Sequence, residues 1–465
     1  MNAAVRFLVA ILLALLAGCA GKPVPDVASQ VSTSVEVILP QRAHLLPEVV
    51  FDGPQLASEA VVVSDQPLLH PAEQAAMHER FLERFFAPWK LKKTSLTPEQ
   101  AFWGVKGLGS KQGYAENLQP FPPQRWSQLV ALQGMESFPS MNYPAIVTRN
   151  TAMRVLPSVR PFFLDPTKPG EGFPFDYFQN SALWLGTPVL VCHVSKDRGW
   201  YFVETAFANG WVRVEDVALA GHDFCEAYET RVMAALVRDD VPLIEGGRLL
   251  GQTHVGAIFP LHSRAGGVLQ VKVPLRDANG WAKTGLAAVP QADAAVMPLP
   301  LTSRTVARLA DAMAGQLYGW GGMFENRDCS STLRDLFLPF GVWLPRNSSQ
   351  QAQHGGRLVS LEGLTPDAKL DVIRRQGMPF ASFISMPGHI GLYLGTDGRG
   401  EPLMLHNMWG VRTTLPDGSA GRAVAGQLVI STLRPGENRP DVRRGAFLER
   451  IRGLTILESG LSVTK

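Results

Sequence analysis

The sequence predicts a multidomain protein in which two small all-β barrels precede an α+β domain. Short strand-like runs separated by polar turns recur over residues 148–220 and 230–290, as small barrels require. After residue 299 the pattern changes to helices followed by alternating strands, which is typical of an α+β domain. The length of 465 residues agrees with this organisation, since it suggests about three domains.

The first residues have the pattern of a lipoprotein signal peptide. A single charge at Arg6 precedes an apolar run over residues 7–17, which is too short to span a bilayer. Small residues then lead directly to Cys19. We expect a signal peptide over 1–18 and a lipid on Cys19 that attaches the protein to the membrane. Ala20 follows, which by resemblance to Gram-negative lipoproteins favours the periplasmic face of the outer membrane. The alternatives are a signal peptide that ends near a cysteine by chance, or a buried apolar start.

Residues 19–147 precede the predicted barrels. Over 19–70 the chain is rich in Pro, Val and Ser without periodicity, which is typical of a tether and an irregular leading segment. Apolar residues at helical spacing then predict a helix from Pro71 to Trp89. We interpret 71–147 as a small helical or irregular N-terminal segment.

Hydrophobic periodicity predicts the strands of the barrels and the helices and strands of the last domain. In the first barrel, alternating runs predict strands over 152–157, 187–194, 200–203 and 210–214. The second barrel has similar short strand-like runs, but its sequence is not an exact repeat of the first. In the domain over 299–440, apolar spacing predicts a helix over 302–317, a second helix over 329–337, and strands from residue 380 onward. Residues 441–465 are expected to be a C-terminal tail.

The formal charge of +3 is close to neutral for a chain of this size. No block of Lys and Arg occurs, so no nucleic acid partner is expected. The chain has four cysteines, of which Cys19 is assigned to lipid. Cys192 and Cys225 could pair in an oxidising periplasm or remain buried thiols, and the sequence does not decide between the two. Cys329 is left as a lone thiol and a candidate nucleophile.

Cys329 is predicted to begin a helix. Asp328 and Ser330 are good helix-start residues, and the apolar periodicity begins at Leu333. A helix N-terminus favours a thiolate, so we expect a lowered pKa for Cys329. The alternative is a small structural cysteine, which polar neighbours make a poorer interpretation.

Two histidines are candidates for the base that a cysteine nucleophile needs. His389 lies near the start of one predicted strand and His406 lies in the next. A two-residue turn at Asp397-Gly398 would place them directly opposite each other on one sheet face. Pro402 complicates this register, and a longer loop with a bulge would still keep the two histidines near each other. Close ligand spacing for zinc is absent, as are the Gly-x-Ser-x-Gly and phosphate-loop patterns, so no metal and no cofactor is expected.

Several motifs, taken together and in this order, resemble the NlpC-type cell-wall peptidases. They are Tyr318-Gly319-Trp320-Gly321-Gly322, Asp328-Cys329-Ser330, Leu344-Pro345-Arg346-Asn347-Ser348 and Gly388-His389-Ile390-Gly391-Leu392-Tyr393-Leu394-Gly395. The barrels resemble bacterial SH3 domains, and the subgroup with two such barrels also carries an N-terminal stabilising segment. The resemblance implies a papain-like fold and a triad in which Cys329 attacks, His389 transfers the proton and His406 orients His389.

The resemblance also implies a substrate. The family cuts peptidoglycan stem peptides after γ-D-glutamyl residues and before a diamino acid, and its SH3-bearing members favour a free L-Ala amine. Implied binding residues are Asp328 for the ammonium, Ser330 with Ser348 and Ser349 for D-Glu, and Tyr318 beside the cysteine.

The first barrel should wall off one side of the cleft. There we take Asp176 as a candidate carboxylate for the amine, with Glu204 behind it; solvated charge is the alternative for both. Ser331 departs from the family's usual Gly after Cys-Ser, so packing behind the nucleophile could differ.

Two other functions remain open at this point. One is an amidase or acyltransferase on the same fold, and the other is a non-catalytic lipoprotein that binds the cell wall. Neither the identity of the diamino acid nor the oligomeric state follows from the sequence.

Overall fold

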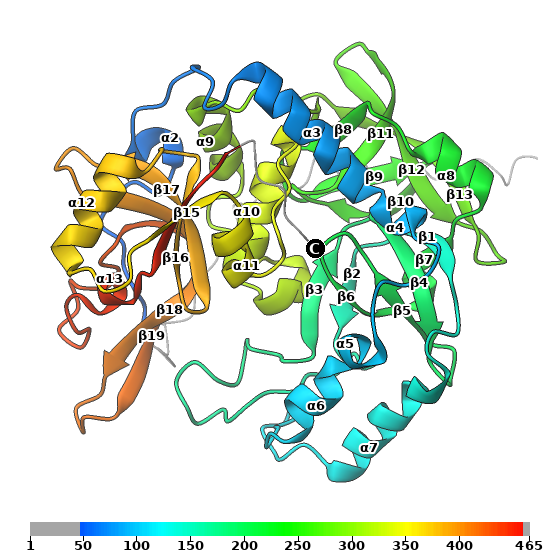
Figure 1. Ribbon diagram of the computed structural model, residues 1–465, viewed down its shortest axis with the longest axis horizontal. Coiled ribbons are helices and arrows are strands. Elements are labelled where there is room, and N and C mark those ends of the chain that lie inside the picture. Colours follow the sequence, from blue (N-terminus) through cyan, green and yellow to red (C-terminus); the bar gives the residue numbers. More distant parts are fainter. Residues whose placement is uncertain (1–46, 459–465) are drawn as a thin grey trace, which may run out of the picture. The chain divides into compact units, whose positions relative to one another are not determined.

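Three antiparallel sheets organise residues 47–458, two of seven strands and one of six. The computed structural model describes residues 47–458, shown in colour in Figure 1. The predicted signal peptide and Cys19 lie outside the described residues. Between 47 and 458, no helix is long and apolar enough to cross a membrane.

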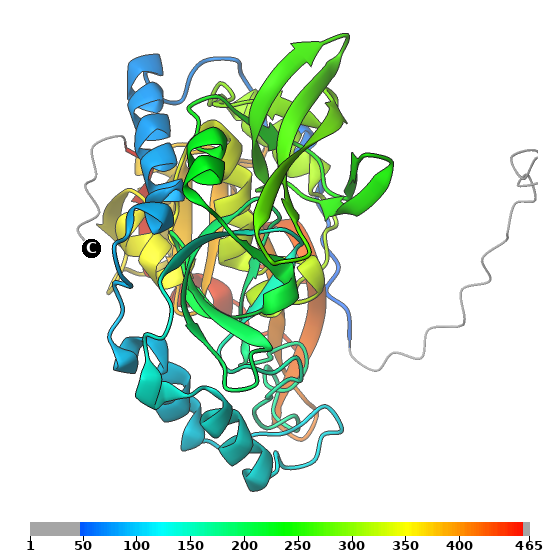
Figure 2. The same ribbon diagram turned by 90° about the vertical axis from the view of Figure 1, so that its right-hand side faces the viewer.

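The N-terminal region is helical. Helix α3 (Pro71–Phe85) is capped by His70 and Glu73, and α4 (Ala87–Lys90) follows it. The predicted helix is therefore interrupted at Phe86, because Pro88 has no amide hydrogen to continue the ladder. The helices are drawn in blue and cyan along one side of Figure 2, with α3 at the top and α7 at the bottom. The other helices are α2 (Ala57–Ala60), α5 (Pro98–Ala101), α6 (Trp103–Gly109) and α7 (Pro123–Leu132).

The first seven-stranded sheet has the order β3-β2-β6-β5-β4-β1-β7. All four strands predicted for the first barrel form, with ends shifted by a few residues. A core of buried apolar side chains, among them Met153, Val191 and Val203, stabilises the sheet. The strands are β1 (Tyr143–Val147), β2 (Thr151–Arg154), β3 (Gln179–Leu183), β4 (Pro188–Val194), β5 (Trp200–Glu204), β6 (Asn209–Arg213) and β7 (Val217–Leu219).

The second sheet has the order β10-β9-β13-β12-β11-β8-β14, and helix α8 (His222–Tyr228) connects it to the first. Tyr228 is fully buried and packs with Trp89 and Ile258, so the N-terminal helices and both sheets share one apolar cluster. The strands are β8 (Met233–Leu236), β9 (Val241–Glu245), β10 (Arg248–Thr253), β11 (Ile258–Ala265), β12 (Val268–Arg276), β13 (Ala282–Pro290) and β14 (Ala294–Val296).

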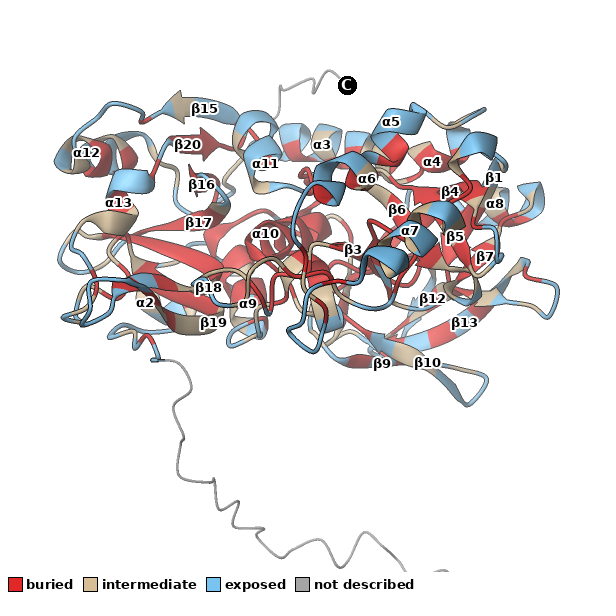
Figure 3. Ribbon diagram, turned by 90° about the horizontal axis from the view of Figure 1, so that it is seen from below, coloured by how far each residue is buried: buried red, intermediate tan, exposed pale blue. Residues whose placement is uncertain are grey.

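The last domain packs helices on a six-stranded sheet of order β15-β20-β16-β17-β18-β19. Helix α9 (Ser303–Ala312) is shorter than predicted, since the chain turns through Gly315 at a φ of 73°. Helix α10 (Cys329–Phe337) is buried along its whole length, as Figure 3 shows. The other elements are α11 (Ser348–His354), α12 (Pro366–Gln376), α13 (Ala446–Arg450), β15 (Arg357–Ser360), β16 (Ser382–Met386), β17 (His389–Thr396), β18 (Pro402–Thr414), β19 (Ala420–Thr432) and β20 (Gly453–Ile456).

The segments on either side of this domain are part of it. Strand β20 lies between β15 and β16, and Leu454 and Ile456 are buried there, so the interval expected to be a tail completes the sheet. At the other end, the Val49 amide donates to the Val424 carbonyl at 2.9 Å, and α2 packs against α9. Runs this short carry no periodicity that distinguishes them from a tail or a tether.

Cys192, Cys225 and Cys329 are free thiols in the described part of the chain. Cys192 is buried in β4, whereas Cys225 lies in α8 and packs with the shared apolar cluster. The structure therefore favours the buried-thiol alternative for Cys192 and Cys225 over a disulfide.

Candidate active site

Cys329 is the first residue of α10, as the sequence predicted. Asp328 caps the helix: its carboxylate accepts from the Ser331 amide at 2.9 Å, and the Asp328 amide donates to Ser331 Oγ at 2.9 Å. Ser331, which departs from the resembled pattern, therefore completes a reciprocal cap. This cap holds the start of the helix, and with it Cys329, in place.

The environment of Cys329 opposes a resting thiolate. Burial, together with the Asp328 charge, raises the pKa of the Cys329 thiol to about 12, although backbone hydrogen bonds from Ile390 and Ser330 act in the opposite direction. The expectation that a helix start would lower this pKa is wrong, because burial and the Asp328 charge outweigh the backbone hydrogen bonds at the helix start. Cys329 therefore holds its proton until a base removes it.

His389 and His406 are hydrogen-bonded to each other, with Nε2 of His389 2.8 Å from Nδ1 of His406. The predicted register is nevertheless wrong by two residues. Leu392 pairs with Leu405, and the turn closes through Asp397 and Glu401 and not through a two-residue Asp-Gly turn. The two histidines are thus diagonal neighbours on one face.

Gly391 makes this diagonal contact possible. A β-carbon at position 391 would lie 2.8 Å from Cβ of His406, closer than side chains approach each other. Because Gly391 has no β-carbon, the space beside His406 stays open for the ring of His389.

The proton positions follow from the hydrogen bonds beyond His406. The Ser431 hydroxyl donates to the Thr432 carbonyl at 2.7 Å, so Ser431 Oγ accepts from His406 Nε2 at 3.0 Å. Nδ1 of His406 then lacks a proton and accepts from Nε2 of His389. This leaves Nδ1 of His389 as the free basic nitrogen.

Both imidazoles are neutral at neutral pH. Burial, with a contribution from the Arg450 charge, lowers the pKa of His389 to about 4. Burial and the neighbouring ring lower the pKa of His406 as well. The site therefore rests with a neutral thiol, which contacts the Ile390 backbone next to His389, and a neutral base.

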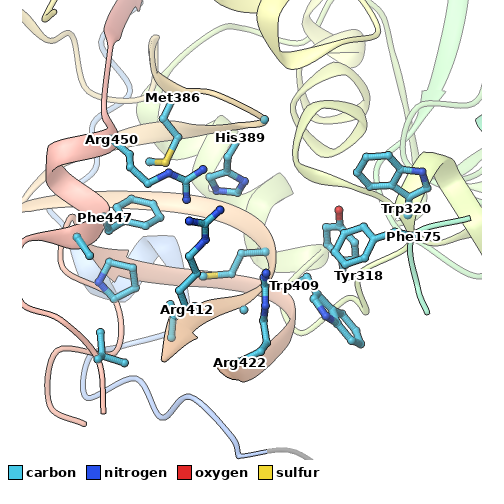
Figure 4. Close-up of a pocket in the computed structure, with 17 residues that line it drawn as sticks. Phe175, Tyr318, Trp320, Met386, His389, Trp409, Arg412, Arg422, Phe447 and Arg450 are labelled. Atoms are coloured by element: carbon cyan, nitrogen blue, oxygen red, sulfur yellow. The ribbon is translucent and has the colours of Figure 1, made fainter. Parts of the chain in front are cut away.

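A pocket of about 210 Å³ opens beside His389. Phe175, from the loop before β3, and the Tyr318 ring border it on one side, and Phe447 of α13 borders it on the other (Figure 4). The same pocket is lined by Arg412, Arg422 and Arg450.

Three family matches cover most of the chain. Residues 315–420 match the NlpC/P60 family, residues 161–213 match an SH3 domain of the SH3b1 type, and residues 8–138 match the N-terminal NLPC_P60 stabilising domain. The chain belongs to the NlpC/P60 family. It is a cysteine peptidase of the class that hydrolyses peptidoglycan, so the non-catalytic alternative is wrong.

One solved structure agrees with this assignment. An NlpC/P60 endopeptidase from Photobacterium damselae subsp. piscicida is 25% identical, with a TM-score of 0.78, over 88% of this chain and 98% of that chain. An NlpC/P60 family protein from Bacillus cereus ATCC 10987 is 17% identical, with a TM-score of 0.43, over 67% and 98% of the two chains. No protein of curated function matches the sequence.

In this NlpC/P60 peptidase the Asp328 carboxylate is already fully engaged. Arg346, which is buried, donates to both carboxylate oxygens, at 3.1 and 2.7 Å, and the Gly321 amide and Ser330 hydroxyl donate to them as well. Although burial opposes ionisation, Arg346 and Ser331 hold the pKa of Asp328 below its usual value. An ammonium ion would have to displace one of these partners.

Of the remaining candidate residues, Tyr318 lines the pocket and the three serines do not. Tyr318 lines the pocket with His389, and burial, with the nearby Cys329 and Asp328, raises its pKa well above the usual value. The Ser330 hydroxyl donates to Asp328 and accepts from Arg346. Ser348 and Ser349 begin α11 but do not line this pocket.

Neither barrel carboxylate is free for an amine. Asp176 pairs with Arg154 at 2.8 Å and accepts from the Phe162 and Phe178 amides at 2.9 Å each. Glu204 accepts from Thr94 at 2.8 Å and also from Ser95. Their burial and these partners give both a structural role, so the structure does not support either as a substrate ligand.

The first barrel meets the catalytic domain at the Gly-rich turn. Gly321 and Gly322 have φ values of 61° and 84°, and a β-carbon on either would lie 2.5–2.6 Å from Gln179 or Ala182 of β3. Arg346 also donates to Ser181 of β3 at 2.9 Å. Sequence reasoning missed the roles of Arg346 and Ser431, since nothing local in the chain links them to Cys329.

Proposed function

We propose that this peptidase is a γ-D-glutamyl-diamino-acid endopeptidase that acts through Cys329, His389 and His406. The observation that carries the proposal is the relay from Thr432 through Ser431 and His406, which leaves Nδ1 of His389 unprotonated on the strand that contacts Cys329. A buried thiol with a raised pKa needs such a base at the moment of attack.

The proposed reaction has two stages. Nδ1 of His389 takes the Cys329 proton as the sulfur attacks the γ-carbonyl carbon, and the same imidazolium then protonates the leaving amine as the carbon–nitrogen bond breaks. A thioester to the D-glutamyl γ-carbon results. Water, deprotonated by His389, hydrolyses this thioester and restores the thiol. His406 stays neutral throughout and holds the His389 ring by the 2.8 Å bond.

A panel of defined stem tripeptides tests the bond specificity. L-Ala-γ-D-Glu-L-Lys should be cut to release L-Ala-D-Glu, whereas the isomer joined through the α-carboxyl of D-Glu should resist. Equal hydrolysis of both isomers would contradict the γ-glutamyl assignment.

The panel also tests the preference for a free L-Ala amine. We propose that the free stem is cut faster than its N-acetyl form, with Asp328 as the candidate partner of the ammonium. Since Arg346 already neutralises Asp328, we expect the preference to be modest, about tenfold or less. Faster cleavage of the acetylated stem would overturn this preference and leave the γ-linkage claim intact.

The relay predicts a specific effect of Ser431→Ala. Without this hydroxyl, His406 loses the acceptor of its Nε2 proton and can adopt the other tautomer, which would place a proton on the wrong nitrogen of His389. We expect kcat to fall about 10- to 100-fold, part of the roughly 10²–10⁴ that a general base contributes. Ser385→Ala, which removes another buried hydroxyl from the same sheet, is the matched control. A similar loss in both variants would argue for a packing effect.

The acid limb of the pH profile should lie unusually low. His389 must be neutral to accept a proton, and its pKa is lowered to about 4. Activity should therefore persist at pH 5 and fall as the pH decreases through about 4, whereas an ordinary histidine would lose half its basicity near about pH 6.5. Measuring kcat against pH, with circular dichroism to confirm folding at each point, checks this. An acid limb near pH 6.5 would contradict it.

We propose, further, that the protein is anchored to the envelope by a lipid on Cys19, on the periplasmic face of the outer membrane. The signal-like pattern before Cys19 supports this proposal. Incorporation of labelled fatty acid into the wild type, and none into Cys19→Ser, is the expected result. Label retained in Cys19→Ser would contradict lipid attachment at Cys19.

A further inference from the structure

Three arginines gather in the pocket beside His389. Arg412 on β18 and Arg422 on β19 are directly paired across the two strands, and Arg450 at the end of α13 joins them. In Figure 4 the three side chains extend into the pocket between Phe447 and Tyr318. Like charges directly opposite each other destabilise a sheet, so this arrangement costs folding energy.

Within residues 47–458 no carboxylate compensates this charge. The lining of the pocket contains no Asp or Glu, and no ion pair joins Arg412, Arg422 or Arg450 to an acidic side chain. Nε of Arg422 is buried without any hydrogen-bond partner. Arg450 makes a bond only to the Pro387 carbonyl, at 3.1 Å.

The charges are close enough to affect one another. Burial lowers the pKa of Arg422, and the Arg412 and Arg450 charges lower it further. Burial and Arg412 likewise lower the pKa of Arg450. An anion held among the three guanidinium groups would relieve this repulsion and satisfy the open donor of Arg422.

The position of the cluster identifies which part of a substrate it would meet. In the proposed reaction His389 delivers its proton to the leaving amine, so groups attached to that amine lie on the His389 side of the cleft. Met386, Met408 and Phe447 add apolar walls there, which suit an aliphatic chain.

We propose that Arg412, Arg422 and Arg450 form a carboxylate subsite for the leaving diamino acid. This inference rests on the proposed function and names the substrate chemistry of the same site. The carboxylate has two sources, the α-carboxylate of the diamino acid at a free peptide end, or a second carboxylate at the far end of its side chain, as in diaminopimelic acid. Guanidinium groups bind either through paired hydrogen bonds.

Three substrates separate these sources. They are L-Ala-γ-D-Glu stems that end in L-lysinamide, in L-lysine, and in meso-diaminopimelic acid with its α-carboxyl amidated. A carboxylate subsite predicts that kcat/KM for at least one acid is about tenfold above that of lysinamide, chiefly through KM. A gain with lysine assigns the α-carboxylate, and a gain with the amidated diaminopimelic acid assigns the second one. Equal kcat/KM for all three would overturn the inference.

Variants then connect the preference to the arginines. Arg412→Gln and Arg422→Gln should lower kcat/KM for the preferred acid about tenfold and leave lysinamide hydrolysis nearly unchanged, and Arg412→Lys should recover part of the loss. Arg399→Gln, which removes the same charge from the turn between β17 and β18, is the matched control and should behave as the wild type. An equal loss of kcat/KM for the acid and the amide substrates would refute carboxylate recognition.

The two proposals fail differently. If the wild type cuts none of the γ-linked stems, the proposed function fails. If it cuts lysinamide as well as it cuts both acids, the endopeptidase assignment stands and only the arginine subsite is refuted.

Discussion

Replacing Cys329 by alanine should reduce hydrolysis of L-Ala-γ-D-Glu-L-Lys by at least about 10⁴-fold, because the proposed reaction passes through a thioester on the Cys329 sulfur. The variant should fold normally. Cys329 is 8% exposed and packs in the catalytic core, where alanine removes only the sulfur. Product release measured by chromatography, with the tripeptide in excess, gives the ratio directly.

Cys192→Ala is the matched control for this prediction. Cys192 is also a buried free thiol, and burial raises its pKa to about 12, but it lies in the first barrel away from the histidines. It should retain wild-type activity. If Cys329→Ala retained activity, or if both variants lost it equally, Cys329 could not be the nucleophile.

The second large effect concerns stability. Arg327 is fully buried and joins the catalytic domain to the second barrel: it pairs with Asp335 at 2.7 Å and with Asp239 at 2.9 Å. It also donates to the Val255 carbonyl at 2.6 Å, while Trp184 of the first barrel donates to Asp335 at 2.9 Å. Arg327→Leu removes one partner of a buried charge network, which should cost about 3–5 kcal/mol.

A lower midpoint of urea unfolding would measure this loss. Arg304→Gln serves as the control, since it breaks an exposed pair with Asp65 at 3.0 Å and should cost less than about 1 kcal/mol. Equal midpoints for Arg327→Leu and the wild type would show that the junction contributes little. Because two domains meet at Arg327, we also expect faster proteolysis between the second barrel and the catalytic domain in this variant.

Much of the fold could be predicted because its signals are local. The strands of the first barrel, the helix that starts at Cys329 and the two histidine strands all follow from periodicity and turn residues. The prediction failed where the signal was short or depended on pairing. Strand β20 lies in the interval that the sequence predicts to be a tail, and the turn after Thr396 is longer than two residues, which moves the register by two.

The site was predictable in part for the same reason. Cys329, His389 and His406 come together because one helix start and one sheet face carry them, and an even shift in register keeps both histidines on that face. The expected thiolate did not follow, since burial depends on what packs around a helix and not on the helix alone.

The sequence by itself determined which residues could do chemistry: a cysteine at a capped helix start, two histidines on neighbouring strands, and barrels ahead of them. Only the tertiary structure decided their charge states and partners. It engaged Asp328 with Arg346, placed Ser431 behind His406, and brought Arg412, Arg422 and Arg450 around one pocket. Desolvation and long-range contacts set these properties, and both depend on residues far apart in the chain.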